Sequence, residues 1–167
     1  MSKSFSKNVE ETEKIAKIFL EKILQKENKK NGAIVVCLSG DLGAGKTAFT
    51  QAIGKHLGIK NKITSPTFVI MKKYPVPEQA RYGAGPLPLI RGIKGVESSF
   101  NFLIHIDAYR LKNEKELLSL GWEEIINNKE HLVFIEWPEN VKKIIPVGAR
   151  FVYISHKENG ERILELK

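Results

Sequence analysis

The sequence is poor in several features that mark secreted and membrane proteins. It holds one cysteine among 167 residues, so no disulfide can form within the chain, and Cys37 in its apolar surroundings is interpreted as a small buried side chain. No apolar run approaches the roughly 20 residues of a membrane-spanning helix. Residues 1–7 lack the apolar core of a secretory signal. These absences predict a cytoplasmic protein that does not enter a membrane.

The charge is basic, but it is not concentrated. The chain has 27 Lys and Arg against 19 Asp and Glu, a formal net charge of +8, and a basic balance favours proximity to nucleic acid. The lysines alternate with glutamates and form no dense block, so strong direct binding of nucleic acid is the weaker interpretation. With 42% hydrophobic and 28% charged residues, residues 1–167 are predicted to form a single globular domain.

The most informative pattern is Gly40-Asp41-Leu42-Gly43-Ala44-Gly45-Lys46-Thr47, which fits the phosphate-binding consensus G-x-x-x-x-G-K-[ST]. An unbroken apolar run over residues 33–38 precedes it, as in a strand buried on both faces. Apolar residues at helical spacing follow over residues 47–57, and Gly58 stands where helices commonly end. The predicted order is therefore buried strand, glycine-rich loop and helix, which is the context of a P-loop.

The residue types in this loop suit a nucleoside triphosphate. Glycines let the backbone turn tightly and approach phosphate oxygens, and the amide groups and the helix dipole attract the anion. Lys46 is predicted to reach the β- and γ-phosphates, and Thr47 to place its hydroxyl on Mg²⁺. The candidate nucleotide-binding residues of this segment are Asp41, Gly43, Ala44, Gly45, Lys46, Thr47 and Ala48.

A second buried strand is predicted over residues 132–135, and Glu136-Trp137-Pro138 follows it directly. In a P-loop protein, a carboxylate after such a strand is placed to hold Mg²⁺ from the side opposite the loop. The alternative is a strand-end charge that water satisfies. We favour the metal role, and Thr47 and Glu136 are the predicted metal ligands.

Two further segments carry polar side chains that could face this site. Ser65 and Thr67 lie in a loop before a predicted strand over residues 68–74, although local bonds to the backbone would also explain their hydroxyl groups. A strand over residues 100–106 alternates Phe100, Phe102, Ile104 and Ile106 on one face with His105 and Asp107 on the other. For His105, a structural role at the strand end is the favoured interpretation.

The remaining segments complete an α/β pattern. The two strands 68–74 and 100–106 could form an antiparallel hairpin, whose tip is a Pro- and Gly-rich loop insertion over about residues 75–99. Helices are predicted over residues 9–28, capped by Asn8, and 114–120, capped by Asn113, and a C-terminal hairpin over residues 150–155 and 162–166. The predicted fold is a three-layer, P-loop NTPase-like α/β domain with a mostly parallel sheet, antiparallel additions and helices on both faces.

Four motifs taken together resemble one family. The motifs are the P-loop, Ser65-Pro66-Thr67-Phe68, His105-Ile106-Asp107-Ala108-Tyr109-Arg110 and Glu136-Trp137-Pro138-Glu139. In order and approximate spacing they look like the TsaE family, formerly YjeE, of bacterial tRNA threonylcarbamoyladenosine biosynthesis. The resemblance covers nearly the whole chain.

The resemblance implies a P-loop ATPase that binds ATP or ADP with Mg²⁺. Its phosphate-binding residues match the glycines, Lys46 and Thr47 of the loop, and its metal ligands match Thr47 and Glu136. The acid thought important for hydrolysis matches Asp107, which with Lys46 is the candidate catalytic pair. Ser65 and Thr67 match a switch-like loop by the nucleotide, and Trp137 matches a tryptophan beside the site.

The same resemblance implies partners. The family's ATPase is weak alone and works with the TsaB–TsaD heterodimer, which modifies adenosine 37 of tRNA, so contact with tRNA is expected indirectly through that complex. Two departures stand out: Ala108 replaces the usual leucine, and the segment 75–99 is longer than usual. A small-molecule P-loop kinase and a non-enzymatic tRNA or DNA binder are the alternatives, while the absence of an Asn-Lys-x-Asp signature disfavours a GTPase.

Overall fold

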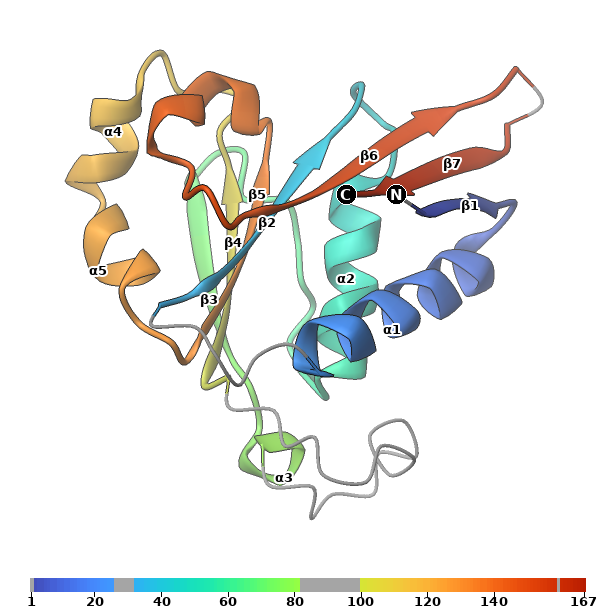
Figure 1. The fold of residues 1–167 in the computed structure, drawn as a ribbon, viewed down its shortest axis with the longest axis horizontal. Coiled ribbons are helices and arrows are strands. Elements are labelled where there is room, and N and C mark those ends of the chain that lie inside the picture. Colours follow the sequence, from blue (N-terminus) through green and yellow to red (C-terminus); the bar gives the residue numbers. More distant parts are fainter. Residues whose placement is uncertain (1, 26–31, 82–99, 159) are drawn as a thin grey trace.

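The structure is a computed structural model that describes residues 2–25, 32–81, 100–158 and 160–167 (Figure 1). Within these residues, seven strands form one sheet in the order β1-β7-β6-β2-β5-β4-β3. The strands are β1 (Ser2–Ser6), β2 (Ile34–Ser39), β3 (Met71–Pro75), β4 (Phe102–Asp107), β5 (His131–Glu136), β6 (Arg150–His156) and β7 (Arg162–Leu166). The helices are α1 (Val9–Gln25), α2 (Lys46–His56), α3 (Glu78–Arg81), α4 (Glu114–Ser119), α5 (Trp122–Ile126) and the 3₁₀ helix η2 (Pro138–Ile144).

The sheet is parallel at its centre and antiparallel toward both edges. β2 pairs in parallel with β5 and β6, and β5 pairs in parallel with β4. β3 runs antiparallel to β4, β7 antiparallel to β6, and β1 antiparallel to β7. This arrangement confirms the predicted mostly parallel sheet with antiparallel additions and both predicted hairpins.

Helices cover both faces of the sheet (Figure 1). Along β2, Val36 and Leu38 belong to the core beneath α1 and α2, whereas Val35 and Cys37 belong to the core beneath α4, α5 and η2. The strand is apolar throughout because both of its faces are covered. Burial raises the pKa of the Cys37 thiol to about 12, so this side chain stays protonated at neutral pH and packs as an apolar group, as predicted.

The predicted helix caps are present. Asn8 Oδ1 accepts a hydrogen bond from the Glu11 N–H at 2.9 Å, and Asn113 Oδ1 accepts one from the Lys115 N–H at 3.0 Å. Each cap satisfies a donor of the first helical turn that has no partner within the helix. The predicted extension of the first helix to residue 28 lies outside the described residues.

The two strands predicted over residues 68–74 and 100–106 differ in detail from β3 and β4. β3 begins at Met71 and not at residue 68, because Val69 and Ile70 donate N–H bonds to the Pro66 carbonyl and form a turn. Ile70 then takes a left-handed conformation with φ of 65°. Phe100 precedes β4 and packs in the core opposite to that of Phe102. The alternation expected across these two residues therefore fails.

The predicted loop 75–99 and the first residues of the chain also differ from expectation. Pro75 still belongs to β3, and α3 forms a short helix after it; residues 82–99 lie outside the described part of the chain. β1 was not predicted. Its sequence is Ser-Lys-Ser-Phe-Ser, which carries little apolar alternation, and it pairs with β7 through backbone hydrogen bonds at the edge of the sheet.

The packing of α2 on the sheet leads to a prediction about stability. Phe49 is fully buried, with its ring centroid 5.6 Å from that of Phe19 and 6.4 Å from that of Phe134. We expect Phe49→Ala to lower the free energy of unfolding by about 3–5 kcal/mol, because the substitution leaves a cavity between α2 and the sheet. Urea unfolding followed by circular dichroism measures this loss.

The matched control is Leu118→Ala, on a half-exposed face of α4, for which a loss below about 1 kcal/mol is expected. Should Phe49→Ala be too unstable to purify, Phe49→Leu provides the milder step in the same direction. Equal losses for positions 49 and 118 would contradict the packing described here.

Candidate functional site

The carboxyl ends of three neighbouring parallel strands meet on one side of the sheet. In the strand register Leu38 lies beside Glu136, and Glu136 lies beside Asp107. β2 ends at Ser39, the residue after Leu38, and the glycine-rich loop follows directly. The loop therefore begins next to both carboxylates. A cavity of about 330 Å³ opens here; its lining residues are Leu42, Gly43, Gly45, Lys46, Thr47, Ser65, Thr67, Asp107, Tyr109, Glu136 and Trp137.

Three glycines of the loop, Gly40, Gly43 and Gly45, have the positive φ that favours glycine, and two of them also lie close to other parts of the chain. Gly40 has φ of 147°, and a Cβ there would lie 2.1 Å from the Ile154 carbonyl oxygen on β6. Gly45 has φ of 107° and stands at the N-terminus of α2. Because Gly45 has no side chain to cap that helix, the first N–H groups of α2 receive no side-chain acceptor from it. Such an unsatisfied helix N-terminus attracts anions.

Lys46 is a buried cation without a carboxylate partner in the described part of the chain. Its side chain is 4% exposed, and Nζ donates to the carbonyl oxygens of Gly40 at 2.6 Å and Asp41 at 2.9 Å. The ammonium also lies 4.1 Å from the centroid of the Trp137 ring. Burial lowers the pKa of Lys46, an effect that the nearby carboxylates partly oppose. An anion within reach would therefore be strongly favoured.

Glu136 accepts two hydrogen bonds on the same oxygen. Thr47 donates its hydroxyl to Glu136 Oε1 at 2.7 Å, and His105 Nε2 lies 2.8 Å from that oxygen. Glu136 is 4% exposed and His105 is fully buried. Since a carboxylate oxygen accepts, Nε2 carries the proton, and His105 Nδ1 has no partner among the described residues. His105 thus orients the carboxylate that faces the P-loop threonine.

Asp107 ties the loop of Ser65 and Thr67 to the end of β4. Asp107 Oδ2 accepts the Thr67 hydroxyl at 2.5 Å and the Ser65 hydroxyl at 3.3 Å. Its other oxygen, Oδ1, accepts the Tyr109 N–H at 2.9 Å. Asp107 is 3% exposed, so this carboxylate is fixed by three donors beside the cavity.

Of the remaining predicted nucleotide-binding residues, some line the main cavity and others do not. The Ala44 side chain packs in the core, and its N–H donates to the Asp41 carbonyl at 3.1 Å, so only its backbone is close to the site. Ala48 lines a neighbouring cavity of about 170 Å³. The Asp41 side chain is exposed and does not line the main cavity. Trp137 lines the cavity and has a left-handed φ of 58°.

Sequence reasoning missed Arg162. A Cβ at Gly45 would lie 3.2 Å from Arg162 Nε, so this side chain from β7 packs directly against the glycine-rich loop. Its Nε is buried and has no hydrogen-bond partner among the described residues. The signal was absent because Arg162 belongs to no motif, and its proximity depends on how the C-terminal hairpin adds to the sheet. The centroid of the Tyr109 ring lies 5.1 Å from that of Trp137. The spacing of residues in the sequence could not decide whether Tyr109 lies at the site.

A glycine-rich loop between a buried parallel strand and a helix, opposite a carboxylate at the end of the adjacent strand, defines a P-loop protein of the α/β class. The comparisons narrow this class. A family model described as "Threonylcarbamoyl adenosine biosynthesis protein TsaE" matches residues 6–164. The chain belongs to the TsaE family, in agreement with the resemblance seen in its sequence.

Individual relatives support this assignment. The chain is 34% identical over 158 residues to the tRNA threonylcarbamoyladenosine biosynthesis protein TsaE of Rickettsia typhi, covering 94% of this chain and 88% of the relative. The Bacillus subtilis protein of the same name is 32% identical over 155 residues, covering 93% and 78%. The crystal structure of Bacillus subtilis YdiB superimposes with a TM-score of 0.63 at 27% identity, covering 99% of this chain and 83% of that one.

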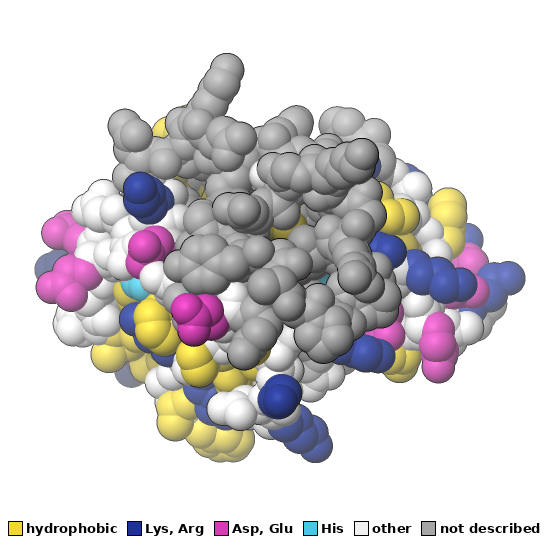
Figure 2. All heavy atoms as spheres, turned by 90° about the horizontal axis from the view of Figure 1, so that it is seen from below, with side chains coloured by type: hydrophobic (Ala, Val, Ile, Leu, Met, Phe, Trp, Pro, Cys, Tyr) yellow, Lys and Arg dark blue, Asp and Glu magenta, His cyan; other side chains and the backbone are white. Residues whose placement is uncertain are grey.

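Figure 2 shows the face of the molecule seen from below Figure 1. Where described residues are visible, Lys and Arg side chains appear at separate points among Asp and Glu side chains and do not form one continuous basic surface. None of the described helices is both long and apolar enough to span a membrane.

The bond between His105 and Glu136 leads to a prediction about stability. We expect His105→Leu to lower the free energy of unfolding by about 1–3 kcal/mol, because it leaves a buried carboxylate with one donor fewer. His105→Gln should restore at least half of this loss, since its amide can reach the position of Nε2. Urea unfolding without nucleotide measures both; an unaltered midpoint for His105→Leu would show that the bond contributes nothing.

Proposed function

We propose that this chain is a cytoplasmic, Mg²⁺-dependent ATPase that converts ATP to ADP and phosphate in the biosynthesis of threonylcarbamoyladenosine at position 37 of tRNA. In this role it acts with the TsaB–TsaD heterodimer and meets tRNA through that complex. The observation that carries the proposal is the gathering of Lys46, the Thr47–Glu136 pair and Asp107 around one cavity beside an uncapped helix N-terminus.

The triphosphate would lie over the glycine-rich loop. The hydrogen bonds of Lys46 go to two carbonyl oxygens of the loop. Its ammonium group can turn to phosphate oxygens when these two hydrogen bonds to neutral acceptors break. The exchange is favourable because a phosphate compensates a buried positive charge, which a carbonyl dipole does only in part. The same residue would neutralise charge that develops on the transferred phosphoryl group, which makes it a catalytic as well as a binding residue.

Thr47 and Glu136 would hold Mg²⁺. Their two oxygens lie 2.7 Å apart, whereas neighbouring ligands of an octahedral Mg²⁺ lie about 2.9 Å apart for bond lengths of about 2.0–2.1 Å. The pair therefore needs little movement to admit the ion. Two protein oxygens leave the other coordination positions to water and phosphate, as Mg²⁺ prefers. The bound ion would stabilise negative charge on the phosphate oxygens.

Asp107 would orient the attacking water. Its carboxylate is held by Thr67, Ser65 and the Tyr109 backbone, so it keeps a fixed direction beside the cavity. Since phosphoryl transfer depends on positioning more than on covalent help, such a group acts on the rate of hydrolysis and little on the affinity for ATP. Ser65 and Thr67 would respond to the nucleotide through the same carboxylate.

The first test is nucleotide binding by Lys46→Ala. We expect its affinity for ATP with Mg²⁺, measured by calorimetry, to fall by about 10- to 100-fold, because a charge-assisted bond contributes about 1.5–3 kcal/mol. ADP should lose less affinity than ATP. The control is Lys55→Ala, an exposed lysine on the same helix, which should bind like the wild type; equal affinities for all three proteins would contradict a P-loop role.

The second test separates binding from hydrolysis. Asp107→Asn should bind ATP with near-normal affinity and hydrolyse it about 10²-fold more slowly, at the lower end of the contribution of positioned acid–base groups. Phosphate release is measured for the chain alone, with TsaB–TsaD, and with tRNA added. Glu124→Gln, an exposed carboxylate of α5, is the control.

A rate that rises with TsaB–TsaD and falls with Asp107→Asn supports the partner-coupled ATPase. Near-normal partner-stimulated hydrolysis by Asp107→Asn would remove this residue from the mechanism. Hydrolysis indifferent to the pair but stimulated by a small acceptor would instead favour the small-molecule kinase.

A further inference from the structure

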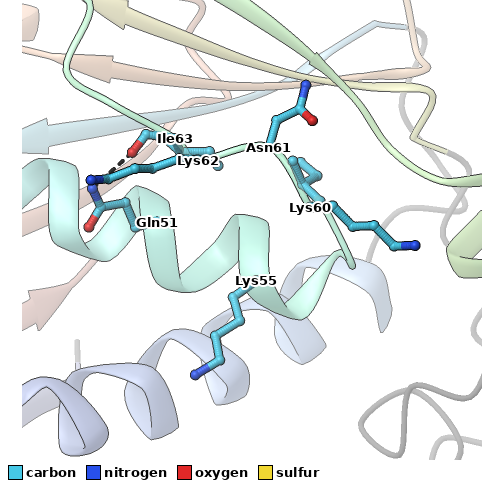
Figure 3. A pocket seen from close by; sticks show the side chains of 7 residues that line it. Gln51, Lys55, Lys60, Asn61, Lys62 and Ile63 are labelled. Atoms are coloured by element: carbon cyan, nitrogen blue, oxygen red, sulfur yellow. Dashed lines mark hydrogen bonds between the residues drawn. The ribbon is translucent and has the colours of Figure 1, made fainter.

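A second cavity, of about 270 Å³, lies beside the C-terminal half of α2 and is separate from the nucleotide-binding cavity (Figure 3). Its lining holds three lysines and two carboxamides and no carboxylate. The lining residues are Gln51, Lys55, Ile59, Lys60, Asn61, Lys62 and Ile63. We refer to residues 58–63, which follow α2, as the lysine loop.

The backbone of the lysine loop is anchored to α2. Gln51 Nε2 donates to the Ile63 carbonyl at 2.9 Å, and the Ile59 N–H donates to the Gly54 carbonyl at 2.9 Å. The Ile63 side chain is 5% exposed and packs closely over Gly54. These contacts fix where the exposed side chains of the loop begin, so a ligand would not have to order the backbone as it binds.

Two lysines of this loop carry charge that no described carboxylate pairs. Lys55 is already bound to Glu13 at 2.7 Å. Lys60 and Lys62 are exposed, and neither forms an ion pair within the described residues. In Figure 3, Lys62 runs back along α2 toward Gln51, Lys60 extends the other way, and Lys55 points toward α1.

The directions of these side chains indicate the kind of ligand. Ammonium groups that diverge cannot enclose one small anion, but they can each contact a different phosphate of a polymer. The Asn61 carboxamide stands between them in sequence and can bond to backbone or base oxygens. Ser65, which bonds to Asp107, follows two residues after the end of the lysine loop, so a polymer bound here would lie close to the nucleotide-binding cavity.

We propose that the lysine loop binds the sugar–phosphate backbone of RNA through Lys60 and Lys62. The choice of RNA over another polyanion rests on the proposed function, because that function places the chain in a pathway that modifies tRNA. The contact reads charge and not sequence, so it positions the chain on its RNA without selecting a base. It adds a direct contact to the indirect one expected through TsaB–TsaD.

The test compares two double variants of the full chain that lose the same charge. Lys60→Gln/Lys62→Gln removes the proposed contact, and Lys112→Gln/Lys115→Gln removes two exposed lysines beside α4, on the other face of the sheet. Binding of an unmodified tRNA transcript is followed by fluorescence anisotropy over a series of salt concentrations. Circular dichroism and ATP affinity confirm that each variant is folded.

We expect Lys60→Gln/Lys62→Gln to weaken binding at low salt on the order of tenfold and to reduce the slope of log affinity against log salt by about two. The control should change affinity less than about twofold. Lys46→Ala should bind the transcript like the wild type, because its buried charge does not reach the lysine loop. Loss of ATP binding and loss of RNA binding are thus observed separately, and either proposal can fail alone.

Three outcomes would overturn the inference. Equal weakening by the two double variants would mean that only net charge matters. Absence of wild-type binding at low salt would mean that there is no such surface. Competition by polyglutamate as effective as that by unlabelled RNA of equal charge would assign the lysine loop to an acidic protein.

Discussion

The site depends on the parallel register of β2, β5 and β4. Because parallel strands end on the same side of a sheet, the glycine-rich loop, Glu136 and Asp107 arrive together although they are far apart in sequence. Helices on both faces bury these strands, which excludes water from beneath the site. Lys46, His105, Asp107 and Glu136 are consequently almost fully buried, and their interactions act at reduced dielectric. Shifting one strand by a residue would turn a carboxylate to the opposite face.

The sequence predicted the centre of the molecule better than its edges. The P-loop, its strand and its helix follow from local patterns, and the end of β5 follows from an apolar run that closes with Glu136. The partner of Asp107 was harder to foresee, since Ser65 and Thr67 equally suited a loop with local bonds. The structure shows that Thr67 bonds to Asp107, which only the antiparallel addition of β3 to β4 brings about.

What sequence reasoning missed has two physical causes. β1 and Arg162 depend on pairing at the sheet edge, where backbone hydrogen bonds act without a side-chain pattern. The late start of β3 depends on the Pro66 carbonyl, which accepts two N–H groups and holds a turn against the β-propensity of Phe68, Val69 and Ile70. Strand propensity reflects packing on a sheet, and the side chains of Phe68 and Val69 are exposed to solvent and gain no such packing.

The left-handed Ile70 has a consequence for the loop that it ends. A β-branched residue at φ of 65° is displaced from its energy minimum by about 1–3 kcal/mol, and the turn at Pro66 and the sheet at Met71 hold it there from both sides. The loop bearing Ser65 and Thr67 is therefore joined to the sheet through a residue with a strained backbone conformation. This strain opposes the hydrogen bonds that hold the loop in place, which include the Ile70 N–H to the Pro66 carbonyl and the Asp107 N–H to the Ile70 carbonyl. The loop is therefore bound to the sheet less strongly than the number of its hydrogen bonds alone would suggest.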